Sequence, residues 1–249
     1  MNLKKNAMRS LFVIMLICLS YVSWATKDNA RNFVPMIGDS APEFTAESTH
    51  GTINFPEDFG NNWKVIFSHP RDFTPVCSTE LLELAHAQKD FEKLGASIIV
   101  VSTDQLVTHF LWKEALEDID FKNRGSSKIK FPLVDDHAYV ISGLYGMSHP
   151  NAARGSNIRG VFFIDRTNRI RAIYFYPSEV GRSTAEIIRT LKALQKTDDN
   201  PDLMTPSDWQ EGEPLMVAHP NPVMLENLKQ PESIYFKYAW FMVYWTNNE

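Results

Sequence analysis

Cys77 lies in the stretch of the chain that is richest in reactive residue types, His-Pro-Arg-Asp-Phe-Thr-Pro-Val-Cys-Ser-Thr-Glu, residues 69–80. Pro75 suits the first turn of a helix, and Thr74 suits its N-cap. Cys77 is then predicted in that first turn, where unpaired N–H groups and the helix dipole favour an anion. A thiolate is such an anion and is the reactive form of cysteine. Cys77 is therefore either an inert buried thiol or an activated nucleophile.

Two apolar segments position this stretch. Residues 63–68 are short and rich in β-branched and aromatic side chains, which predicts a buried strand. Residues 81–94 carry apolar side chains at helical spacing and end at Gly95, which predicts a helix. Residues 96–102 are apolar without alternation, as expected for a strand covered on both faces. Further strands are expected at 43–47, 52–55, 159–165 and 169–176, the last two as a hairpin.

Three further helices are expected. One opens at Thr103 and Asp104 and is predicted to present an apolar face; its members are Leu106, Phe110, Leu111 and Leu116. A short helix is expected at 139–144. Ser183, followed three residues later by Glu186, predicts the start of the last helix. Strands alternate with helices, so the fold class is α/β with a mixed central sheet flanked by helices.

The chain divides into three predicted parts. Residues 1–25 are expected to be a signal peptide, 26–196 a main domain, and 197–249 a small C-terminal extension. Residues 196–202 are charged and rich in helix breakers, which favours a linker. Loops are expected at 119–130 and 148–157.

The N-terminus has the pattern of an export signal. Lys4, Lys5 and Arg9 precede an apolar run over residues 11–19, and small residues precede a cleavage site after Ala25. The alternative is an uncleaved N-terminal anchor. Cleavage would remove Cys18, so the mature chain would hold one cysteine and form no intrachain disulfide. The expected location is periplasmic or secreted, with no membrane attachment after cleavage.

Composition excludes several classes of function. The chain has 249 residues, 44% of them hydrophobic and 22% charged, which is ordinary for a globular protein. The net charge is −5 and no basic run exceeds two residues, so nucleic-acid binding is not expected. The histidines show no metal-ligand spacing, so neither a metal nor another cofactor is predicted.

Residues 70–77 match the Pro-x-x-x-Thr-x-x-Cys signature of peroxiredoxins. The segments 38–44 and 159–165 resemble the same family, and residues 205–209 resemble the C-terminal extension of its one-cysteine (1-Cys) subgroup. The resemblance covers Met36 to about Val217, and the chain departs from the family pattern from about Met224. It implies a thioredoxin-like fold and a thiol peroxidase that reduces hydrogen peroxide and organic hydroperoxides.

The resemblance also implies roles for individual residues. Cys77 would attack the peroxide and become a sulfenic acid. Arg159 would lie against Cys77, favouring the thiolate and later the charge on the leaving oxygen, and Arg182 would support the site. The resemblance further implies that the Thr74 hydroxyl would bond to the thiolate and the peroxide. Pro70 would shield the thiolate from water. His69 and Glu80 would orient substrate and arginine.

The number of cysteines predicts how the sulfenic acid is reduced back to the thiol. With one mature cysteine, the sulfenic acid must be reduced by an external thiol or a redox protein. The family implies a homodimer or a higher homo-oligomer. A lipase-like Gly-x-Ser-x-Gly motif found in some 1-Cys relatives is absent from residues 59–64, so phospholipase activity is not expected.

Two other functions remain open at the level of sequence. A thioredoxin-type disulfide oxidoreductase would share the fold, but its chemistry uses Cys-x-x-Cys, and here Cys77 is followed by Ser-Thr-Glu. A non-catalytic holdase or interaction module on the same fold is the second alternative.

Overall fold

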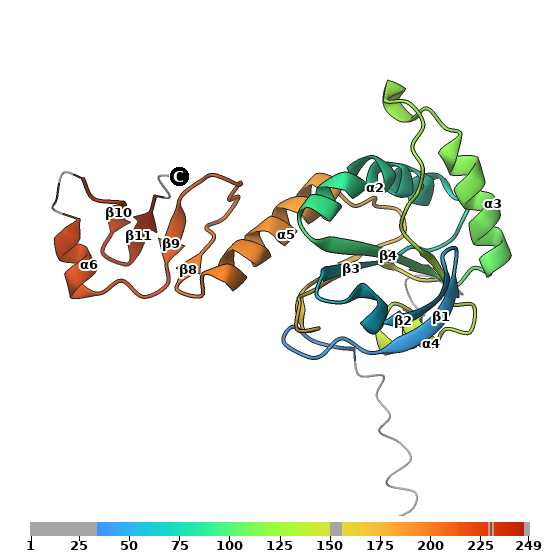
Figure 1. Cartoon of the computed structure of the whole chain (residues 1–249), viewed down its shortest axis with the longest axis horizontal. Helices are drawn as coiled ribbons and strands as arrows, with labels where there is room; N and C mark the ends of the chain where they lie inside the picture. The colour runs from blue at the N-terminus through green and yellow to red at the C-terminus, as the bar shows by residue number, and fades with distance from the viewer. Residues whose placement is uncertain (1–33, 150–155, 229, 231, 247–249) are drawn as a thin grey trace, which may run out of the picture. The chain divides into compact units, whose positions relative to one another are not determined.

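The computed structural model describes residues 34–149, 156–228, 230 and 232–246. Its main feature is a seven-stranded mixed sheet with strand order β2-β1-β5-β4-β3-β6-β7 (Figure 1). Strands β3, β4 and β5 run parallel, and the other pairings are antiparallel. This confirms the α/β class. The strands are β1 (Phe44–Ser48), β2 (Gly51–Phe55), β3 (Trp63–Ser68), β4 (Ala96–Ser102), β5 (Leu133–Asp135), β6 (Arg159–Ile164) and β7 (Ile170–Tyr176).

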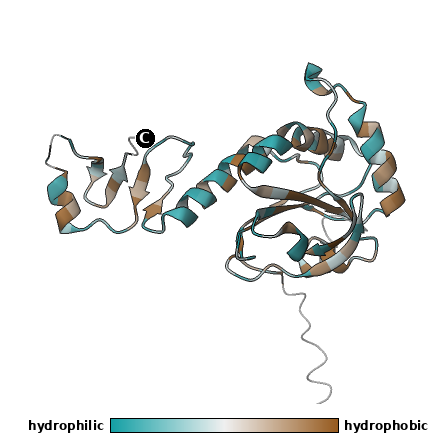
Figure 2. Cartoon of the chain, viewed as in Figure 1, coloured by the Kyte–Doolittle hydropathy of each residue, from teal (hydrophilic) through white to brown (hydrophobic). Residues whose placement is uncertain are grey.

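The sheet separates two apolar cores. Alternate residues of a strand point to opposite faces, so Val65 of β3 packs with helices α2 (Pro75–Lys93), α3 (Leu106–Glu117) and α5 (Thr184–Asp199), while Ile66 packs on the side of α4 (Val140–Leu144). All six residues of β3 are buried. The central strands are accordingly among the most hydrophobic parts of the chain (Figure 2). Within the described residues, no helix is both long enough and apolar enough to cross a membrane.

Helix α2 begins and ends where the sequence predicts. Thr74 is its N-cap and Pro75 its first residue, because proline has no N–H to leave unpaired and its fixed φ suits a helix start. Gly95 follows the helix with a positive φ of 58°, a conformation that glycine adopts without strain. The strand β3 and this helix together hold the loop of residues 69–74 between them.

The buried face of α3 differs from the prediction. Phe110 and Leu111 are 48% and 57% exposed, while His109, Trp112 and Leu116 are buried. The helix also starts at Leu106 rather than at residues 103–104, because the Asp104 carboxylate accepts other hydrogen bonds. His109 forms a hydrogen bond with Asp72 in the loop before α2, and Trp112 donates to Ser78 of α2. These polar contacts fix the rotation of α3 and outweigh the apolar pattern.

Helix α5 and the C-terminal sheet form the remainder of the described chain. Ser183 caps α5 as predicted, accepting a hydrogen bond from the Glu186 N–H. The helix continues to Asp199, so the first part of the predicted 196–202 linker is helical. The Thr197 hydroxyl donates to the carbonyl of Ala193, and Asp198 accepts a hydrogen bond from Arg171. Pro201, which cannot continue a helix, follows its end. Four short strands then pair in the order β10-β11-β9-β8. They are β8 (Leu203–Met204), β9 (Leu215–Val217), β10 (Tyr235–Ala239) and β11 (Met242–Trp245), with α6 (Pro222–Asn227) between β9 and β10.

Some predictions fall outside the described residues. They include the signal peptide over residues 1–25 with Cys18, and most of the loop predicted at 148–157. The division of the chain at residues 196 and 197 stays a prediction.

Candidate active site

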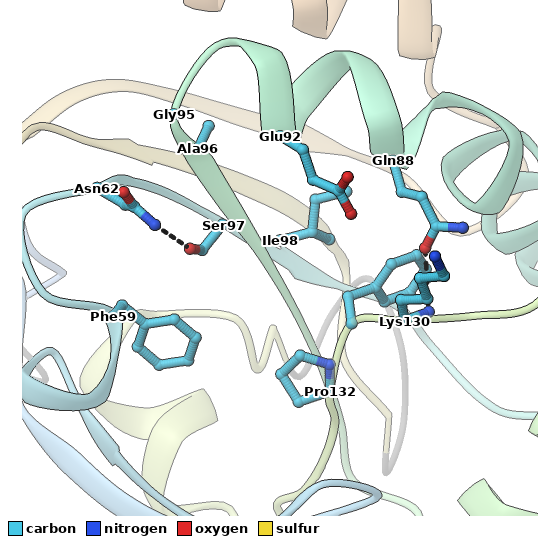
Figure 3. A pocket seen from close by; sticks show the side chains of 11 residues that line it. Phe59, Asn62, Gln88, Glu92, Gly95, Ala96, Ser97, Ile98, Lys130 and Pro132 are labelled. Atoms are coloured by element: carbon cyan, nitrogen blue, oxygen red, sulfur yellow. Dashed lines mark hydrogen bonds between the residues drawn. The ribbon is translucent and has the colours of Figure 1, made fainter.

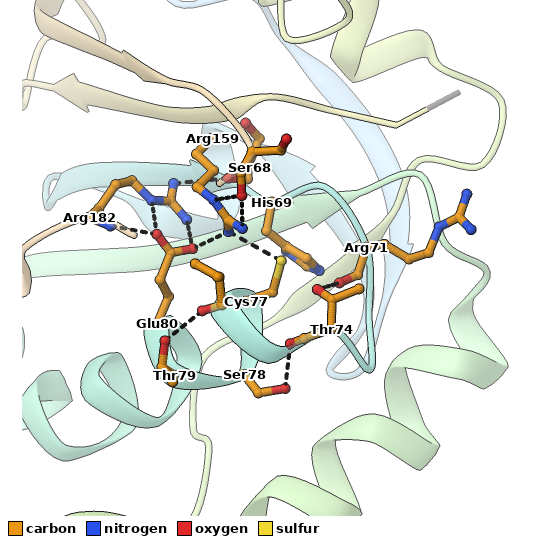
Figure 4. Close-up of polar contacts among 12 residues, drawn as sticks. Ser68, His69, Arg71, Thr74, Cys77, Ser78, Thr79, Glu80, Arg159 and Arg182 are labelled. Atoms are coloured by element: carbon orange, nitrogen blue, oxygen red, sulfur yellow. Dashed lines mark hydrogen bonds and ion pairs between the residues drawn. The ribbon is translucent and has the colours of Figure 1, made fainter. Parts of the chain in front are cut away.

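Cys77 is the third residue of α2 and is fully buried. Its Sγ lies 3.2 Å from Nη1 of Arg159, which donates a hydrogen bond to it (Figure 4). The same Nη1 donates to Oε2 of Glu80 at 2.8 Å. The sulfur therefore sits at a helix N-terminus and against a guanidinium, the two features that stabilise a thiolate.

The topology explains why Arg159 reaches the sulfur. Arg159 opens β6, which runs antiparallel to β3 with Val161 opposite Phe67. The start of β6 therefore lies at the end of β3, where the loop leading to Cys77 begins. The backbone carbonyl of Ser178 accepts hydrogen bonds from Nε and Nη2 of Arg159 and fixes the plane of the guanidinium.

Glu80 lies one helical turn after Cys77 and binds two arginines. Its Oε1 accepts hydrogen bonds from Nε and the backbone N–H of Arg182, at 2.9 and 2.7 Å, and its Oε2 accepts from Nη2 of Arg182 and from Arg159. Burial by itself would raise the pKa of Glu80, but the hydrogen bonds and charge of Arg182, with the charge of Arg159, outweigh burial and hold the pKa below its ordinary value. Glu80 is therefore ionised at neutral pH.

Arg182 supports the site without touching the sulfur. Besides Glu80, its guanidinium donates to the carbonyls of Ser68 and Gly160 at 2.9 and 2.7 Å. It thereby ties the end of β3 to the start of β6. Arg182 and Arg159 carry two positive charges against the single negative charge of Glu80, so this buried group has an excess charge of one. A thiolate at Cys77 would balance that charge.

Thr74 and Pro70 occupy the loop around Cys77. Pro70 is buried, and Thr74 is half-buried. The Thr74 hydroxyl donates to the carbonyl of Arg71 at 2.8 Å, so the predicted bond from this hydroxyl to the sulfur is not formed in the structure. The cause is local: this hydroxyl closes a short turn with the residue three positions earlier.

His69 belongs to a buried hydrogen-bond network that the sequence analysis did not foresee. Its Nε2 lies 2.8 Å from Oδ1 of Asp72, and Oδ2 of Asp72 lies 2.6 Å from Nδ1 of His109 on α3. The backbone N–H of Asp72 donates to Oδ2 of Asp104 at 2.8 Å. Trp112, three residues after His109, packs against the His69 ring. The i, i+3 spacing of His109 and Trp112 was the sequence signal that could have revealed this face of α3.

This network also contains the one group among the described residues whose donor atoms could gather around a metal ion. Ligand atoms of His69, Asp72 and Asp104 lie within 4.8 Å of one another. The Asp72 carboxylate, however, faces ring nitrogens of two histidines, and Asp104 accepts hydrogen bonds from Asp72 and Ser102. These atoms are engaged within the protein, so we interpret the group as a hydrogen-bond network.

A separate pocket lies where α2 ends and β4 begins (Figure 3). It encloses about 350 Å³ and is lined by residues that include Asn62, Ser97 and Gln88. Asn62 donates to Ser97, and Gln88 bonds to the backbone of Lys128 and Lys130. Its polar groups are thus used in holding the loop before β5, and neither Cys77 nor the two buried arginines line it.

Comparison with known proteins gives a consistent result. The model of the AhpC/TSA family matches residues 37–173, which include Cys77 and Arg159. A peroxiredoxin of Methanosarcina mazei is 39% identical over 198 residues, covering 79% of this chain and 89% of the relative. A 1-Cys peroxiredoxin of Dictyostelium discoideum is 38% identical over 192 residues, covering 75% and 77%.

Solved structures agree with the sequence relatives. A yeast mitochondrial 1-Cys peroxiredoxin superposes with a TM-score of 0.73 at 30% identity, covering 85% of this chain and 99% of that one. A mutant of peroxiredoxin 6 from Arenicola marina gives a TM-score of 0.74 at 29% identity, covering 85% and 97%. Fold and site together define a thioredoxin-like, thiol-dependent peroxidase, an oxidoreductase. The chain belongs to the AhpC/TSA family of peroxiredoxins.

Proposed function

We propose that Cys77 reduces hydrogen peroxide and organic hydroperoxides through a sulfenic acid that an external thiol then reduces. The observation that carries this proposal is the excess positive charge of the buried group formed by Arg159, Arg182 and Glu80, with Nη1 of Arg159 only 3.2 Å from the sulfur. A buried uncompensated charge is costly. Ionising the thiol removes that cost and creates the nucleophile.

The chemical step follows from this geometry. The thiolate attacks the terminal hydroxyl oxygen of the peroxide, the O–O bond breaks, and its electron pair goes to the leaving oxygen, which takes a proton from water. Arg159 would stabilise the negative charge that develops on that oxygen. Thr74 would contribute its hydroxyl to the bound peroxide after rotating away from the carbonyl of Arg71. Pro70, which is buried, would limit the access of water to the sulfur.

Cys77 is the one free cysteine among the described residues, which supports reduction of the sulfenic acid from outside the chain. The similar yeast protein is described as resolved by glutathione/thioredoxin systems, and we propose a small thiol or a redox protein of this class here. Mass spectrometry of the mature protein after one equivalent of peroxide tests the proposal. Addition of one oxygen to Cys77 is expected, and a disulfide as the main stable product would contradict it.

The two rival functions make different predictions. A disulfide oxidoreductase would reduce insulin disulfides, whereas we expect this chain to be nearly inert in that assay. A holdase would not need a reactive sulfur, so its Cys77 would react with peroxide at the rate of free cysteine. Peroxide consumption measured with a panel of thiol and protein reductants separates these functions and identifies the reductant.

The proposal also covers the location of the protein and its oligomeric state. The pattern of residues 1–25 supports export to the periplasm or the exterior with cleavage after Ala25. N-terminal sequencing of the exported protein should begin at Thr26, and an intact Met1 would contradict cleavage. Family membership supports a homodimer or a higher homo-oligomer, which sedimentation of the mature chain would measure.

A further inference from the structure

Arg159 lies in the middle of a three-residue turn at the point where β6 begins. The N–H of Gly160 donates to the carbonyl of Ile158 at 3.2 Å, which is the hydrogen bond of a γ-turn. The backbone on either side of the middle residue sets the direction in which its side chain leaves. The position of the Arg159 guanidinium therefore depends on how firmly Ile158 and Gly160 are held.

The Ser68 hydroxyl binds both neighbours of Arg159. Its Oγ donates to the carbonyl of Ile158 at 2.7 Å and accepts from the N–H of Gly160 at 2.8 Å. A hydroxyl can donate one hydrogen bond and accept others, so this one group holds the turn at both ends. Ser68 is fully buried, so water does not compete for these bonds. Figure 4 shows Ser68 at the end of β3, beside Arg159.

Gly160 leaves the room that this hydroxyl needs. A Cβ at position 160 would lie 2.9 Å from Oγ of Ser68, closer than such atoms approach one another in proteins, and 3.3 Å from the ring of Phe162. The regular pairing of β3 with β6 ends at Phe67, opposite Val161. The side chain of Ser68 thus joins the two strands at the next position along the chain.

Ser68 does not touch the sulfur. Alternate residues of a strand point to opposite faces of the sheet, so Ser68 points to the same face as Ile66. Ile66 and Phe162 belong to the core on the side of α4, whereas Cys77 belongs to the core on the side of α2. Any effect of the Ser68 hydroxyl on Cys77 must therefore pass through another residue.

We propose that Ser68 is a positioning residue, whose hydroxyl holds the backbone of Arg159 so that Nη1 stays 3.2 Å from the sulfur of Cys77. The inference rests on the peroxidase function proposed above. The carbonyl of Ser178 fixes the guanidinium end of Arg159, and Ser68 fixes its backbone end. Holding both ends matters, because a misplacement of about 1 Å at a reacting group can cost about a hundredfold in rate.

Ser68→Ala tests the inference, with Ser48→Ala as the matched control. Ser48 is buried in β1, and its Oγ also donates to a backbone carbonyl, that of Gly51 at 2.7 Å, and accepts from a backbone N–H, that of His50 at 3.1 Å. Each variant therefore loses the same kinds of hydrogen bond. Urea unfolding should show a similar loss of stability in both.

The rate at which hydrogen peroxide oxidises Cys77 should separate the two variants. It should fall by about tenfold in Ser68→Ala and stay within about twofold of the wild type in Ser48→Ala. The loss in Ser68→Ala is partial because Arg182 still binds the carbonyls at the ends of both strands.

A double variant shows whether Ser68 acts through Arg159. Adding Ser68→Ala to Arg159→Lys should change the remaining rate by less than about twofold, because the guanidinium that Ser68 positions is already absent. A purely structural effect of Ser68 would instead lower the rate by the same factor in both backgrounds.

Equal oxidation rates in Ser68→Ala and Ser48→Ala would overturn the inference, and so would a further loss of about tenfold in the Arg159→Lys background. Failure of Ser68→Ala to fold where Ser48→Ala folds would also overturn it, since the hydroxyl would then serve the fold and not the site. A wild-type Cys77 that reacts with peroxide no faster than free cysteine would instead contradict the proposed peroxidase function, so the two failures are distinguishable.

Discussion

At the scale of single residues, the site depends on how charge is distributed around one sulfur. Arg159 shares its Nη1 between Cys77 and Glu80, and Glu80 in turn is held by Arg182. Arg159 is 2% exposed and Glu80 5%, so solvent screens these charges weakly. The carboxylate positions both arginines while cancelling only half of their charge.

Arg159→Lys should lower the rate of peroxide reduction by about a hundredfold, because an ammonium cannot reach Cys77, Glu80 and the Ser178 carbonyl together as the guanidinium does. Arg166→Lys, at an exposed position, is the matched control and should leave the rate unchanged. Stopped-flow kinetics of Cys77 oxidation would measure both. A wild-type rate in Arg159→Lys would show that the guanidinium is not part of the reaction.

Glu80→Gln should destabilise the protein at pH 7 by about 3 kcal/mol, because it leaves two buried guanidinium groups without their carboxylate. Since the folded-state pKa of Glu80 is lowered from 4.5, its ionisation stabilises the fold fully above that value and loses this effect as the pH falls through the folded pKa. Urea unfolding of both proteins from pH 7 to pH 3 should therefore show the difference shrinking with acidity. A pH-independent difference would contradict the account.

Sequence reasoning pointed to Cys77 through a local helix-start signal and to Arg159 through the resemblance of residues 159–165 to the peroxiredoxin family. It missed Asp72 and His109 as partners. The contact between these two depends on the rotation of α3, which joins residues 37 positions apart. The i, i+3 spacing of His109 and Trp112 indicates that they share a face of α3, but it does not say which residues of the loop before α2 that face meets.

At the scale of elements, hydrophobic patterns in the sequence predict where the strands and helices lie, but not the rotation of α3. Strands β3 and β4 follow from continuous apolar runs, and α2 from its proline and glycine boundaries. For α3, the apolar side chains of Phe110 and Leu111 indicated a face that is exposed. His109, which is buried and has a partner on each ring nitrogen, sets the orientation of α3 instead. Phe110 and Leu111 therefore remain on the exposed surface of the helix.

Leu116→Ala and Leu111→Ala test this assignment as a matched pair on one helix. Leu116 is 2% exposed and Leu111 57%. Leu116→Ala should lower the free energy of unfolding by about 2–5 kcal/mol, and Leu111→Ala by less than about 0.5 kcal/mol. Urea denaturation measures both, and comparable losses would mean that α3 is rotated toward the face predicted from sequence.

At the scale of the whole molecule, Cys77 and the C-terminal sheet belong to different hydrophobic clusters. The cluster containing Cys77 joins β3 and β6 to α2, whereas Trp209 and Leu215 pack with Ala193 in a small separate cluster. The match to the family model ends at residue 173, before this second sheet begins. The strand pairing of β8 to β11 could not be predicted, because these strands are two to five residues long and carry weak patterns.

Trp209→Ala should therefore loosen the C-terminal sheet, with a loss of about 3–5 kcal/mol in the stability of that cluster. The rate at which peroxide oxidises Cys77 should stay within about twofold of the wild type, since no contact of Trp209 reaches the sulfur. Trp240→Ala, at a position 71% exposed, is the control and should change neither property. Hydrogen exchange of residues 203–217 and the oxidation rate would check the prediction, and a large loss of rate would show that the extension shapes the site.

The central claim is that the buried charge around Cys77 makes its sulfur a thiolate that attacks peroxide. The most direct measurement is the second-order rate constant for oxidation of Cys77 by hydrogen peroxide at pH 7, compared with free cysteine under the same conditions. The account predicts a rate at least about a hundredfold above that of free cysteine, lost in Arg159→Lys. A rate equal to that of free cysteine, unchanged by that substitution, would contradict it.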